Sequence, residues 1–351
     1  MADQSEYAIM VDAKMLKTIQ ENLNEMPPYV KDYFRSRLTT TSVRTLRQYS
    51  YSLRKFFRWL KSAIPELENY STNEIPLDVI AQLTPRDVEE YMVYLQADSN
   101  SPNSRGSVAQ KISCLSAFLS YLYRHGDIPN DPCVKVDRPK VVQDKRIIYL
   151  TDEESIRLLD TIEYGNPSIP AHQLNYLEKT RCRDLAIATL LLNTGIRLSE
   201  CVGLDITDID LNERKMQVYR KGGKYQYLPL NDEVLEILTQ YIAERKQTVV
   251  LDKKHANALF LSMQRRRING MSIENMITKY AQFAGITKPI TPHKLRKTYG
   301  TALYRKTRDI YMTANALGHE NVATTSRHYV DDNADSLREV ADTMRIRPTG
   351  T

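Results

Sequence analysis

Apolar side chains in the first third of the chain recur at the spacing of amphipathic helices. In the segment 42–61 they follow one another at steps of seven, four and three residues, which makes one side of a helix apolar: Leu46, Leu53, Phe57 and Leu60. Similar spacing predicts helices within 1–40, with a break at Pro27 and Pro28, and over 84–96 and 107–124. Thr84 and Pro85 supply a cap and a first-turn proline. Four helices without a convincing strand predict an all-α first domain.

A stretch without helical periodicity follows these helices. Residues 127–145 hold Pro129, Pro132 and Pro139 among charged side chains, which is typical of an extended linker. We therefore predict a helical domain over residues 1–137, a linker over 138–148 and a second domain over 149–351.

The second domain is predicted to combine helices with one hairpin. Thr151 and Glu154 have the spacing of a capping box that starts a helix, and the apolar run 184–193 predicts a buried helix. Residues 216–230 form two strand-like segments around the turn Lys-Gly-Gly-Lys. The expected fold class is mainly α, with a mostly helical second domain that contains a small β-sheet.

Composition excludes several classes of protein. The chain has 351 residues, 42% of them hydrophobic, which suits two packed domains and not a disordered chain. It has no apolar run of membrane-spanning length and no leader-like N-terminus. Its four cysteines lack C-x-x-C spacing and suggest neither a zinc cluster nor a disulfide framework. We expect a cytoplasmic protein without membrane contact.

Positive charge gathers on the polar side of the segment 42–61. The net charge of the chain is only +6, so clustering matters more than the total. Six cations lie in this predicted helix with no acidic residue among them: Arg44, Arg47, Arg54, Lys55, Arg58 and Lys61. A stripe laid along DNA phosphates and a merely solvated face both fit this pattern. The tract 264–267, which holds three arginines, leaves the same two alternatives.

An anion site is predicted where a helix starts near residue 291. His293 and Arg296 stand three positions apart and so share one side of a helical turn. Thr291 is a candidate N-cap and Pro292 a first-turn proline. The pair would therefore lie near backbone N–H groups that favour phosphate.

Two further segments carry polar residues that need partners. A glycine turn ends the buried run and presents Arg197, whose buried stem requires an anion. Glu200, three residues on, is placed to hold this guanidinium. Gly318 is expected to stop another helix and to turn His319 back toward it. Tyr329 follows ten residues after His319, beside a second histidine.

Together these motifs resemble the signature of the tyrosine recombinase, or phage integrase, family. The matching segments stand in the family's order along the chain: 194–200, Lys221 in its hairpin, 293–296, 317–319 and Tyr329. Within the family the chain is most similar to the Xer recombinases, including the XerS type. The resemblance implies an all-helical, SAM-like core DNA-binding domain followed by a tyrosine-recombinase catalytic domain.

The resemblance also implies a role for each matching residue. The implied catalytic set is Arg197, Lys221, His293, Arg296, His319 and Tyr329, with Glu200 in support. Tyr329 would attack a DNA phosphodiester and leave a 3′-phosphotyrosyl link with a free 5′-hydroxyl. The two arginines would bind the non-bridging oxygens, and the histidines would assist proton transfer and phosphate binding. Lys221 would protonate the 5′ leaving oxygen, with Lys224 as the less favoured choice.

The chemistry makes the same demands on the site. Guanidiniums stabilise charge on phosphate oxygens as metal ions do elsewhere, so no metal or cofactor is expected. A phenol with a pKa near 10 needs neighbouring cations and an imidazole to favour its deprotonation. A covalent link conserves the bond energy, so rejoining needs no ATP, and the chain has no P-loop sequence.

Partners follow from the same resemblance. It implies double-stranded DNA at a specific inverted-repeat site and a homotetramer on synapsed DNA. The C-terminal tail, with Leu337, Val340 and Met344 at helical spacing, would dock on a neighbouring protomer, and the alternative is a helix packed on its own domain. A DNA translocase is a further candidate partner. Chromosome-dimer resolution is the expected role. Integration or excision of a mobile element, type IB topoisomerase-like relaxation and a non-catalytic DNA-binding regulator are the alternatives.

Overall fold

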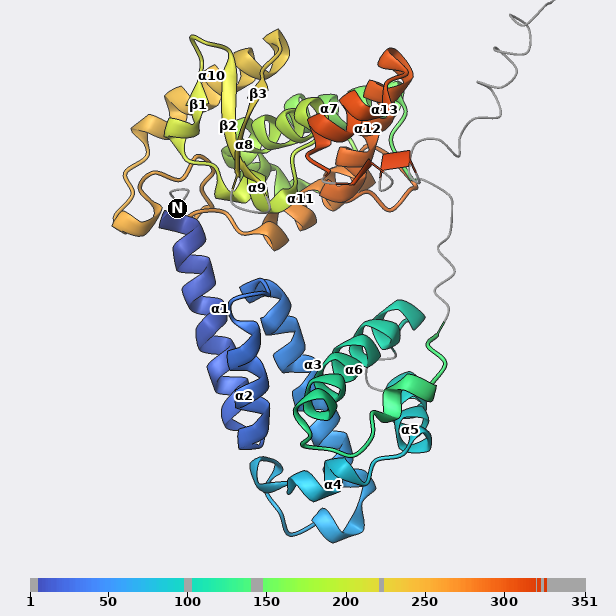
Figure 1. Cartoon of the computed structure of the whole chain (residues 1–351). Helices are drawn as coiled ribbons and strands as arrows, with labels where there is room; N and C mark the ends of the chain where they lie inside the picture. The colour runs from blue at the N-terminus through green and yellow to red at the C-terminus, as the bar shows by residue number, and fades with distance from the viewer. Residues whose placement is uncertain are drawn as a thin grey trace, which may run out of the picture. The chain divides into compact units, whose positions relative to one another are not determined.

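The chain forms two compact units in a computed structural model (Figure 1). The described residues are 6–97, 103–139, 148–220, 224–319, 321, 322, 325 and 326. One unit comprises residues 6–144, and the other comprises 145–351 together with the first five residues. Most of the predicted linker, 140–147, lies outside the described residues, so the linker bounds stay a prediction.

The N-terminal unit is helical throughout its described part. Its α-helices are α1 (Glu6–Asn24), α2 (Pro28–Arg37), α3 (Val43–Ala63), α4 (Leu77–Ala81), α5 (Pro85–Ala97) and α6 (Arg105–His125). Short 3-10 turns lie at Pro65–Leu67, Thr72–Glu74 and Pro132–Lys135. The prediction of four helices was wrong in number for two reasons. The segment 1–40 forms two helices, α1 and α2, which separate at the predicted break, and α4 spans only five residues, too few to show a helical period.

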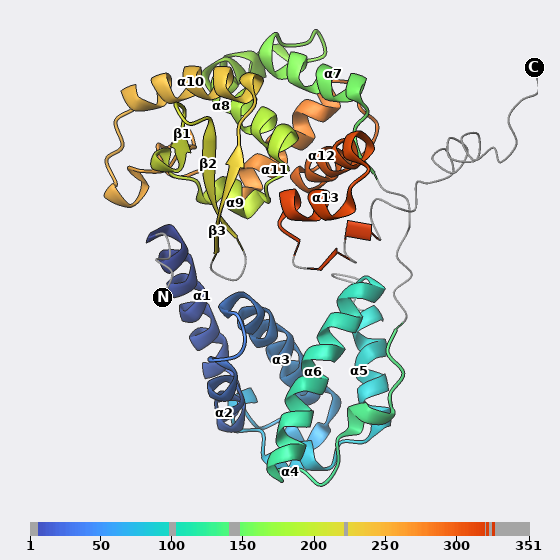
Figure 2. The same ribbon diagram turned by 45° about the horizontal axis from the view of Figure 1, so that its top comes forward.

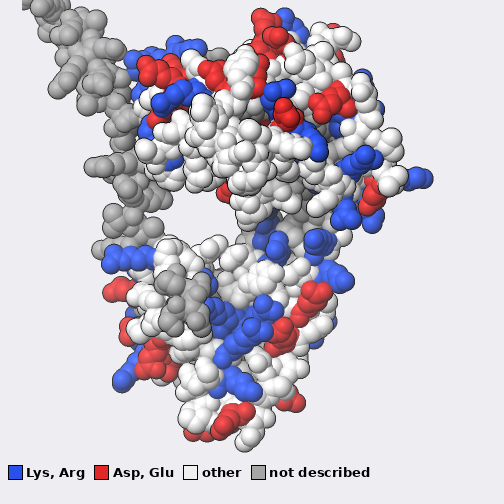
Figure 3. Space-filling model, turned by 180° about the vertical axis from the view of Figure 1, so that it is seen from behind, with Lys and Arg blue, Asp and Glu red and all other residues white. Residues whose placement is uncertain are grey.

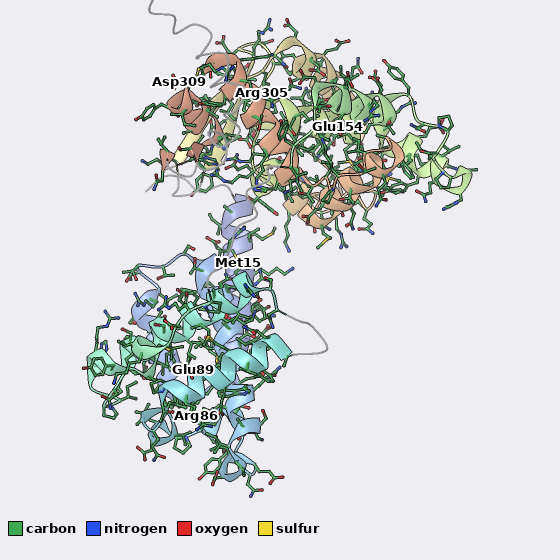
Figure 4. All side chains as sticks on the ribbon, turned by 90° about the vertical axis from the view of Figure 1, so that its right-hand side faces the viewer. Met15, Arg86, Glu89, Glu154, Arg305 and Asp309 are labelled. Carbon is green, nitrogen blue, oxygen red and sulfur yellow. The ribbon has the colours of Figure 1, made fainter. Side chains whose placement is uncertain are left out.

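Helix α3 lies at the centre of this unit and packs against α1 and α6. The side chain of Ser42 caps it by accepting from the backbone N–H of Thr45 at 3.3 Å. Leu53 and Phe57 are fully buried, which confirms the predicted apolar face. On α5, Val88 is buried while Arg86 and Glu89, labelled in Figure 4, are exposed. Each helix thus buries one face in a shared core.

The C-terminal unit contains helices and one small sheet. Its α-helices are α7 (Asp152–Glu163), α8 (Ala171–Thr194), α9 (Leu198–Gly203), α10 (Asp232–Gln247), α11 (Gly270–Phe283), α12 (Pro292–Thr307) and α13 (Ile310–Leu317). Its strands are β1 (Ile209–Asp210), β2 (Lys215–Arg220) and β3 (Lys224–Pro229), and 3-10 turns lie at Ile206–Asp208 and Lys253–His255. The predicted capping box is present at α7, where Glu154 (Figure 4) accepts from the backbone of Thr151 at 2.8 Å.

Helix α8 organises this unit, because α7, α10 and α12 all pack against it. The structure extends it well before the predicted start at residue 184. Its first half is polar and largely exposed, so no apolar run marked it, whereas 184–191 is buried without interruption. The helix ends at Gly195, whose φ of 59° is left-handed.

The three strands form one antiparallel sheet in the order β1, β2, β3 (Figure 2). In β2 the residues Met216, Val218 and Arg220 are buried and alternate with partly exposed ones. The predicted hairpin is confirmed: Arg220 pairs with Lys224 across it, and the turn 221–223 lies outside the described residues. Strand β1 is only two residues long and was not predicted.

Within the described part of the chain, no helix combines the length and the apolar character that crossing a bilayer demands.

Candidate active site

The turn between α8 and α9 places Arg197 and Glu200. Glu200 is buried, with one carboxylate oxygen accepting from Arg197 Nη1 at 2.7 Å and the other from the Arg197 backbone N–H at 2.8 Å. Arg197 Nη2 donates to the carbonyl of Gly318 at 2.8 Å. The predicted contact between Glu200 and Arg197 is therefore present, and it fixes one edge of the guanidinium.

Helix α12 begins where the sequence predicted, with Pro292 in the first turn before His293 and Arg296. Thr291 stands at the N-cap position, but its side chain makes no capping hydrogen bond. The side chains of His293 and Arg296 differ in their surroundings, however. Arg296 is 5% exposed, and its Nη1 and Nη2 donate to the carbonyls of Gly195 and Leu317, while His293 is exposed. The helix therefore offers one buried cation and one accessible imidazole, not a matched pair on its surface.

Helix α13 presents His319 at its C-terminal end. Asp309, labelled in Figure 4, caps the start of this helix by accepting from the N–H groups of Tyr311 and Met312 at 2.8 and 2.9 Å. Gly318 ends it with a φ of 61°, and the His319 N–H returns to the Ala314 carbonyl at 2.9 Å. This is the predicted turn-back.

The imidazole of His319 has a partner that the sequence did not predict. Its Nδ1 lies 2.8 Å from Oγ1 of Thr325, which is fully buried. Such a contact fixes the ring and leaves Nε2 as the nitrogen directed elsewhere.

A third arginine, Arg220, joins the site and was missed. It is 6% exposed, and its Nη1 donates to Glu200 at 2.7 Å while its Nη2 donates to the Ala316 carbonyl at 3.0 Å. Gln226 on the next strand accepts from its Nε at 2.9 Å. The alternation of β2 carried the signal: Arg220 shares the inward face with Met216 and Val218, and a buried arginine demands several acceptors.

The site is organised around the C-terminal carbonyls of α13. The last carbonyls of a helix have no intrahelical partner, and here side chains from distant elements fill them. Gln226 Nε2 donates to Asn315 at 3.2 Å, Arg220 to Ala316, Arg296 to Leu317 and Arg197 to Gly318. Three guanidiniums thus meet the negative end of one helix dipole.

Three candidates lie outside the described residues. Lys221 belongs to the turn 221–223, and Tyr329 with its neighbour His328 belongs to the segment 327–351. The predicted tail helix around Leu337 lies in the same segment. Their places in the site remain predictions.

The basic face of α3 is present but is partly paired. Glu25 of α1 accepts from Arg54 at 3.1 Å and from Arg58 at 2.6 Å, an acidic partner that the sequence of α3 alone did not reveal. Arg44 and Arg47 are exposed and have no carboxylate partner among the described residues. The guanidinium of Arg47 lies 5.7 Å from the ring centroid of Tyr51, and Lys55 Nζ lies 5.8 Å from that of Tyr94.

Figure 3 shows a band of Lys and Arg side chains across one face of the N-terminal unit, with few acidic ones between them. Cations interleaved with aromatic rings are typical of nucleic-acid surfaces.

One arginine of the basic tract 264–267 is neither solvated nor available to DNA. Arg267 is 9% exposed and donates to the carbonyls of Val202 and Leu204 at 3.0 and 2.7 Å and to the Asp205 carboxylate. It therefore anchors the chain after α9. The other two arginines of the tract, Arg265 and Arg266, are exposed.

Comparison with known families decides what this arrangement belongs to. The model of the phage integrase family matches residues 149–336, and that of the phage integrase N-terminal SAM-like domain matches residues 30–126. The chain belongs to the phage integrase family. The two matches fall in the two compact units, one in each.

Curated relatives of this phage integrase family member are tyrosine recombinases of the Xer type. Tyrosine recombinase XerC of Caldanaerobacter subterraneus is 32% identical over 330 residues, which cover 90% of this chain and 86% of that protein. Tyrosine recombinase XerS of Streptococcus mutans is 32% identical over 349 residues, covering 91% and 96%. The chain is therefore a tyrosine recombinase with Xer-type relatives along almost its whole length.

Solved structures of recombinases share the fold. XerH bound to its palindromic difH substrate has a TM-score of 0.68 at 18% identity, with 94% of this chain and 88% of that chain covered. The Tn1549 transposon integrase in complex with transposon right end DNA has a TM-score of 0.65 at 18% identity, covering 90% and 98%. At these identities the likeness shows a shared fold, and both solved structures hold their protein in complex with DNA.

Proposed function

We propose that the protein is a site-specific recombinase that cuts and rejoins double-stranded DNA through a 3′-phosphotyrosyl intermediate. The observation that carries the proposal is the convergence of Arg197, from the turn between α8 and α9, and Arg296, from α12, on the last turn of α13, which presents His319. Displacement at a phosphodiester places negative charge on the non-bridging oxygens, and preorganised cations stabilise that charge.

Arg197 is the cation best placed to meet a phosphate. Its side chain is 32% exposed. A guanidinium side chain has five N–H groups, and in Arg197 one donates to Glu200 and one to Gly318, so three have no acceptor among the described residues. Arg296 is held more firmly, because both of its terminal nitrogens donate to backbone carbonyls. We assign Arg197 to a direct phosphate contact and Arg296 to a fixed positive charge beside it.

The remaining catalytic roles follow the family pattern. Tyr329 attacks phosphorus, the bond to the 5′ oxygen breaks, and Lys221 supplies the proton that this leaving oxygen takes up. His319 and His293 assist proton transfer and phosphate binding. Rejoining reverses the step with a new 5′-hydroxyl, so the reaction as proposed needs neither a cofactor nor a metal, since guanidiniums supply the positive charge.

DNA contact by α3 is part of the proposal. Arg44 and Arg47 would contact phosphates directly. Lys55 would add to the same face, and Arg54 and Arg58 would contribute only part of their charge because both pair with Glu25. The slope of log affinity against log salt is negative, and each lost phosphate contact reduces its magnitude by about 1. We therefore expect the double variant Arg44→Gln, Arg47→Gln to reduce the magnitude of that slope by about 2. The control Arg86→Gln, Arg124→Gln replaces two exposed arginines on α5 and α6 and should leave the slope unchanged.

The role that best fits the relatives is Xer-type resolution of chromosome dimers at an inverted-repeat site. That role implies a cytoplasmic protein, a homotetramer on paired DNA joined by C-terminal tails, and a DNA translocase as a partner. The structural likeness to the Tn1549 integrase makes integration or excision of a mobile element the second candidate.

A covalent-capture experiment tests the proposal. Protein incubated with fragmented genomic DNA should yield a protein–DNA adduct, and sequencing the attached DNA should identify one inverted-repeat site. Tyr329→Phe should abolish the adduct and spare binding, whereas Tyr311→Phe, which removes an exposed hydroxyl, should change neither. An intact wild-type protein that binds DNA without forming an adduct would indicate a regulator. Relaxation of supercoiled plasmids that lack the site would indicate a type IB topoisomerase.

A further inference from the structure

Arg220 connects three parts of the site that are far apart in the sequence. From the end of β2 its guanidinium reaches Glu200 in α9 and the carbonyls of Ala316 and Leu317 at the end of α13, at 2.7, 3.0 and 3.5 Å. Gln226 on β3 orients it from the other side. No other arginine in the described part of the chain bridges a strand, α9 and α13 in this way.

The close approach of Arg220 to α13 depends on Gly318. A Cβ atom at this glycine would lie 2.8 Å from Nε and 2.9 Å from Cζ of Arg220. The guanidinium therefore lies directly against the backbone of the turn that leads to His319. Because Gly318 also accepts from Arg197, Arg220 packs on the same peptide group that positions the phosphate-directed arginine.

Arg220 also determines how Glu200 is shared. A carboxylate and a guanidinium alone tend to pair through two parallel hydrogen bonds, which consume two donors of the arginine. Here Arg220 and the Arg197 backbone N–H occupy one oxygen of Glu200, so that Arg197 spends only Nη1 on the carboxylate. Without Arg220, Glu200 would be free to rotate onto Arg197 and to neutralise more of its charge.

We propose that Arg220 is a positioning residue of strand cleavage, which holds Glu200 and the last turn of α13 so that the guanidinium of Arg197 faces the scissile phosphate. The inference rests on the proposed function, since it needs a cleavage reaction. It assigns Arg220 no contact with DNA, because the residue is 6% exposed and each of its three nitrogens donates to a protein acceptor.

Cleavage of two matched substrates tests this assignment. One is a suicide duplex with an ordinary phosphodiester at the site recovered by covalent capture. The other carries a methylphosphonate there, in which a methyl group replaces one non-bridging oxygen and removes the charge that Arg197 stabilises. Loss of a residue that orients a site group slows reactions by roughly 10- to 100-fold, so Arg220→Ala should be slowed by that factor on the phosphodiester in single-turnover assays. On the methylphosphonate its rate should fall within about threefold of wild type.

The chain offers a matched control in Arg245. This arginine is also buried and donates to two backbone carbonyls, those of Ala258 and Ala256 at 3.0 and 2.7 Å, but none of these contacts belongs to the candidate site. Arg245→Ala should lower the stability of the protein, and its cleavage rate relative to wild type should be the same on the two substrates. If Arg245→Ala showed the same relief on the methylphosphonate, the assay would be reporting folding, and the proposal would be overturned.

Arg220→Lys decides the question if Arg220→Ala does not fold. Lysine keeps the buried charge but lacks the planar fork that joins Glu200 to α13. The Arg220→Lys variant should therefore cleave the phosphodiester more slowly than wild type and the methylphosphonate at close to the wild-type rate. Equal slowing on both substrates, or a wild-type rate on the phosphodiester, would refute the positioning role.

Arg197→Ala separates failure of this inference from failure of the proposed function. If wild type forms no adduct on either substrate, the recombinase function itself is wrong. If the methylphosphonate restores the relative cleavage rate of Arg197→Ala but not that of either Arg220 variant, the proposed recombinase function is supported and only the positioning role of Arg220 is refuted.

Discussion

Replacing Gly195 by alanine probes the turn that leads to Arg197 and that accepts a hydrogen bond from Arg296. Gly195 ends α8 in the left-handed region with a φ of 59°, and its carbonyl accepts from Arg296. A Cβ atom there would lie 2.3 Å from Cδ1 of Tyr299 and 3.1 Å from Cδ2 of Leu317. The first distance is well inside van der Waals contact, so either the ring of Tyr299 or the backbone must move.

The expected cost has two parts. An L-residue in the left-handed region costs about 1–2 kcal/mol, and forcing a methyl group into a packed site costs about 1–3 kcal/mol more. Gly285 in the same unit provides the control, because its φ is 69° and a Cβ there would meet nothing within 4 Å. Gly285→Ala should therefore cost only the first part, and Gly195→Ala roughly 2–5 kcal/mol in total.

Thermal unfolding of both variants measures the difference. For a unit of this size each kcal/mol lowers Tm by about 2–4 °C, so Gly195→Ala should melt several degrees below Gly285→Ala. Covalent-adduct formation should also fall in Gly195→Ala alone, since the displaced carbonyl is a partner of Arg296. Equal melting temperatures for the two variants would show that the turn tolerates a side chain and would refute the close packing of Gly195 on Tyr299.

Three further predictions concern stability. Arg267→Ala should destabilise the protein by about 3–5 kcal/mol because it strips buried partners from Asp205 and two carbonyls, while exposed Arg266→Ala should change it by less than about 0.5 kcal/mol in urea unfolding. The hydroxyl of Tyr91 is buried without a hydrogen-bond partner among the described residues, so Tyr91→Phe should leave the free energy of unfolding unchanged or raise it by about 1 kcal/mol. Tyr241→Phe is the control: it loses a 2.9 Å hydrogen bond to the Leu259 carbonyl and should lower the free energy of unfolding by about 1 kcal/mol. Burial raises the pKa of the Glu154 carboxyl, but hydrogen bonds from Lys288 and Thr151 outweigh this and leave that pKa below its usual 4.5. The stability from Glu154 is thus present above about pH 4.5 and lost as the pH falls through the lowered folded-state pKa, so Glu154→Gln should lose less stability than wild type between about pH 6 and pH 3.

Local signals predicted most of the fold. The predicted caps Thr84 and Thr151 each accept a hydrogen bond from the backbone N–H three residues later, a relation between residues close together in the chain. The α3 face and the hairpin were equally local, because their periods are set by backbone geometry. Helix α8 shows the limit: its exposed first half has no apolar period, and only packing against α7 and α10 shows that it is one helix.

The sequence by itself determined which residues end the helices and where Arg197, Arg296 and His319 fall relative to those ends, since a left-handed glycine and a first-turn proline act within a few residues. The sequence also predicted the contact of Arg197 with Glu200, but only the tertiary structure decided the distant backbone partners. One acceptor of Arg197 lies 121 positions away, one of Arg296 lies 101 positions away, and one of Arg220 lies 96 positions away. Side-chain donors have no preference for a particular carbonyl along the chain, so their pairing is set by which helix ends packing brings together. The same reason buries Arg267, pairs Arg54 with Glu25 and makes Arg220 part of the site.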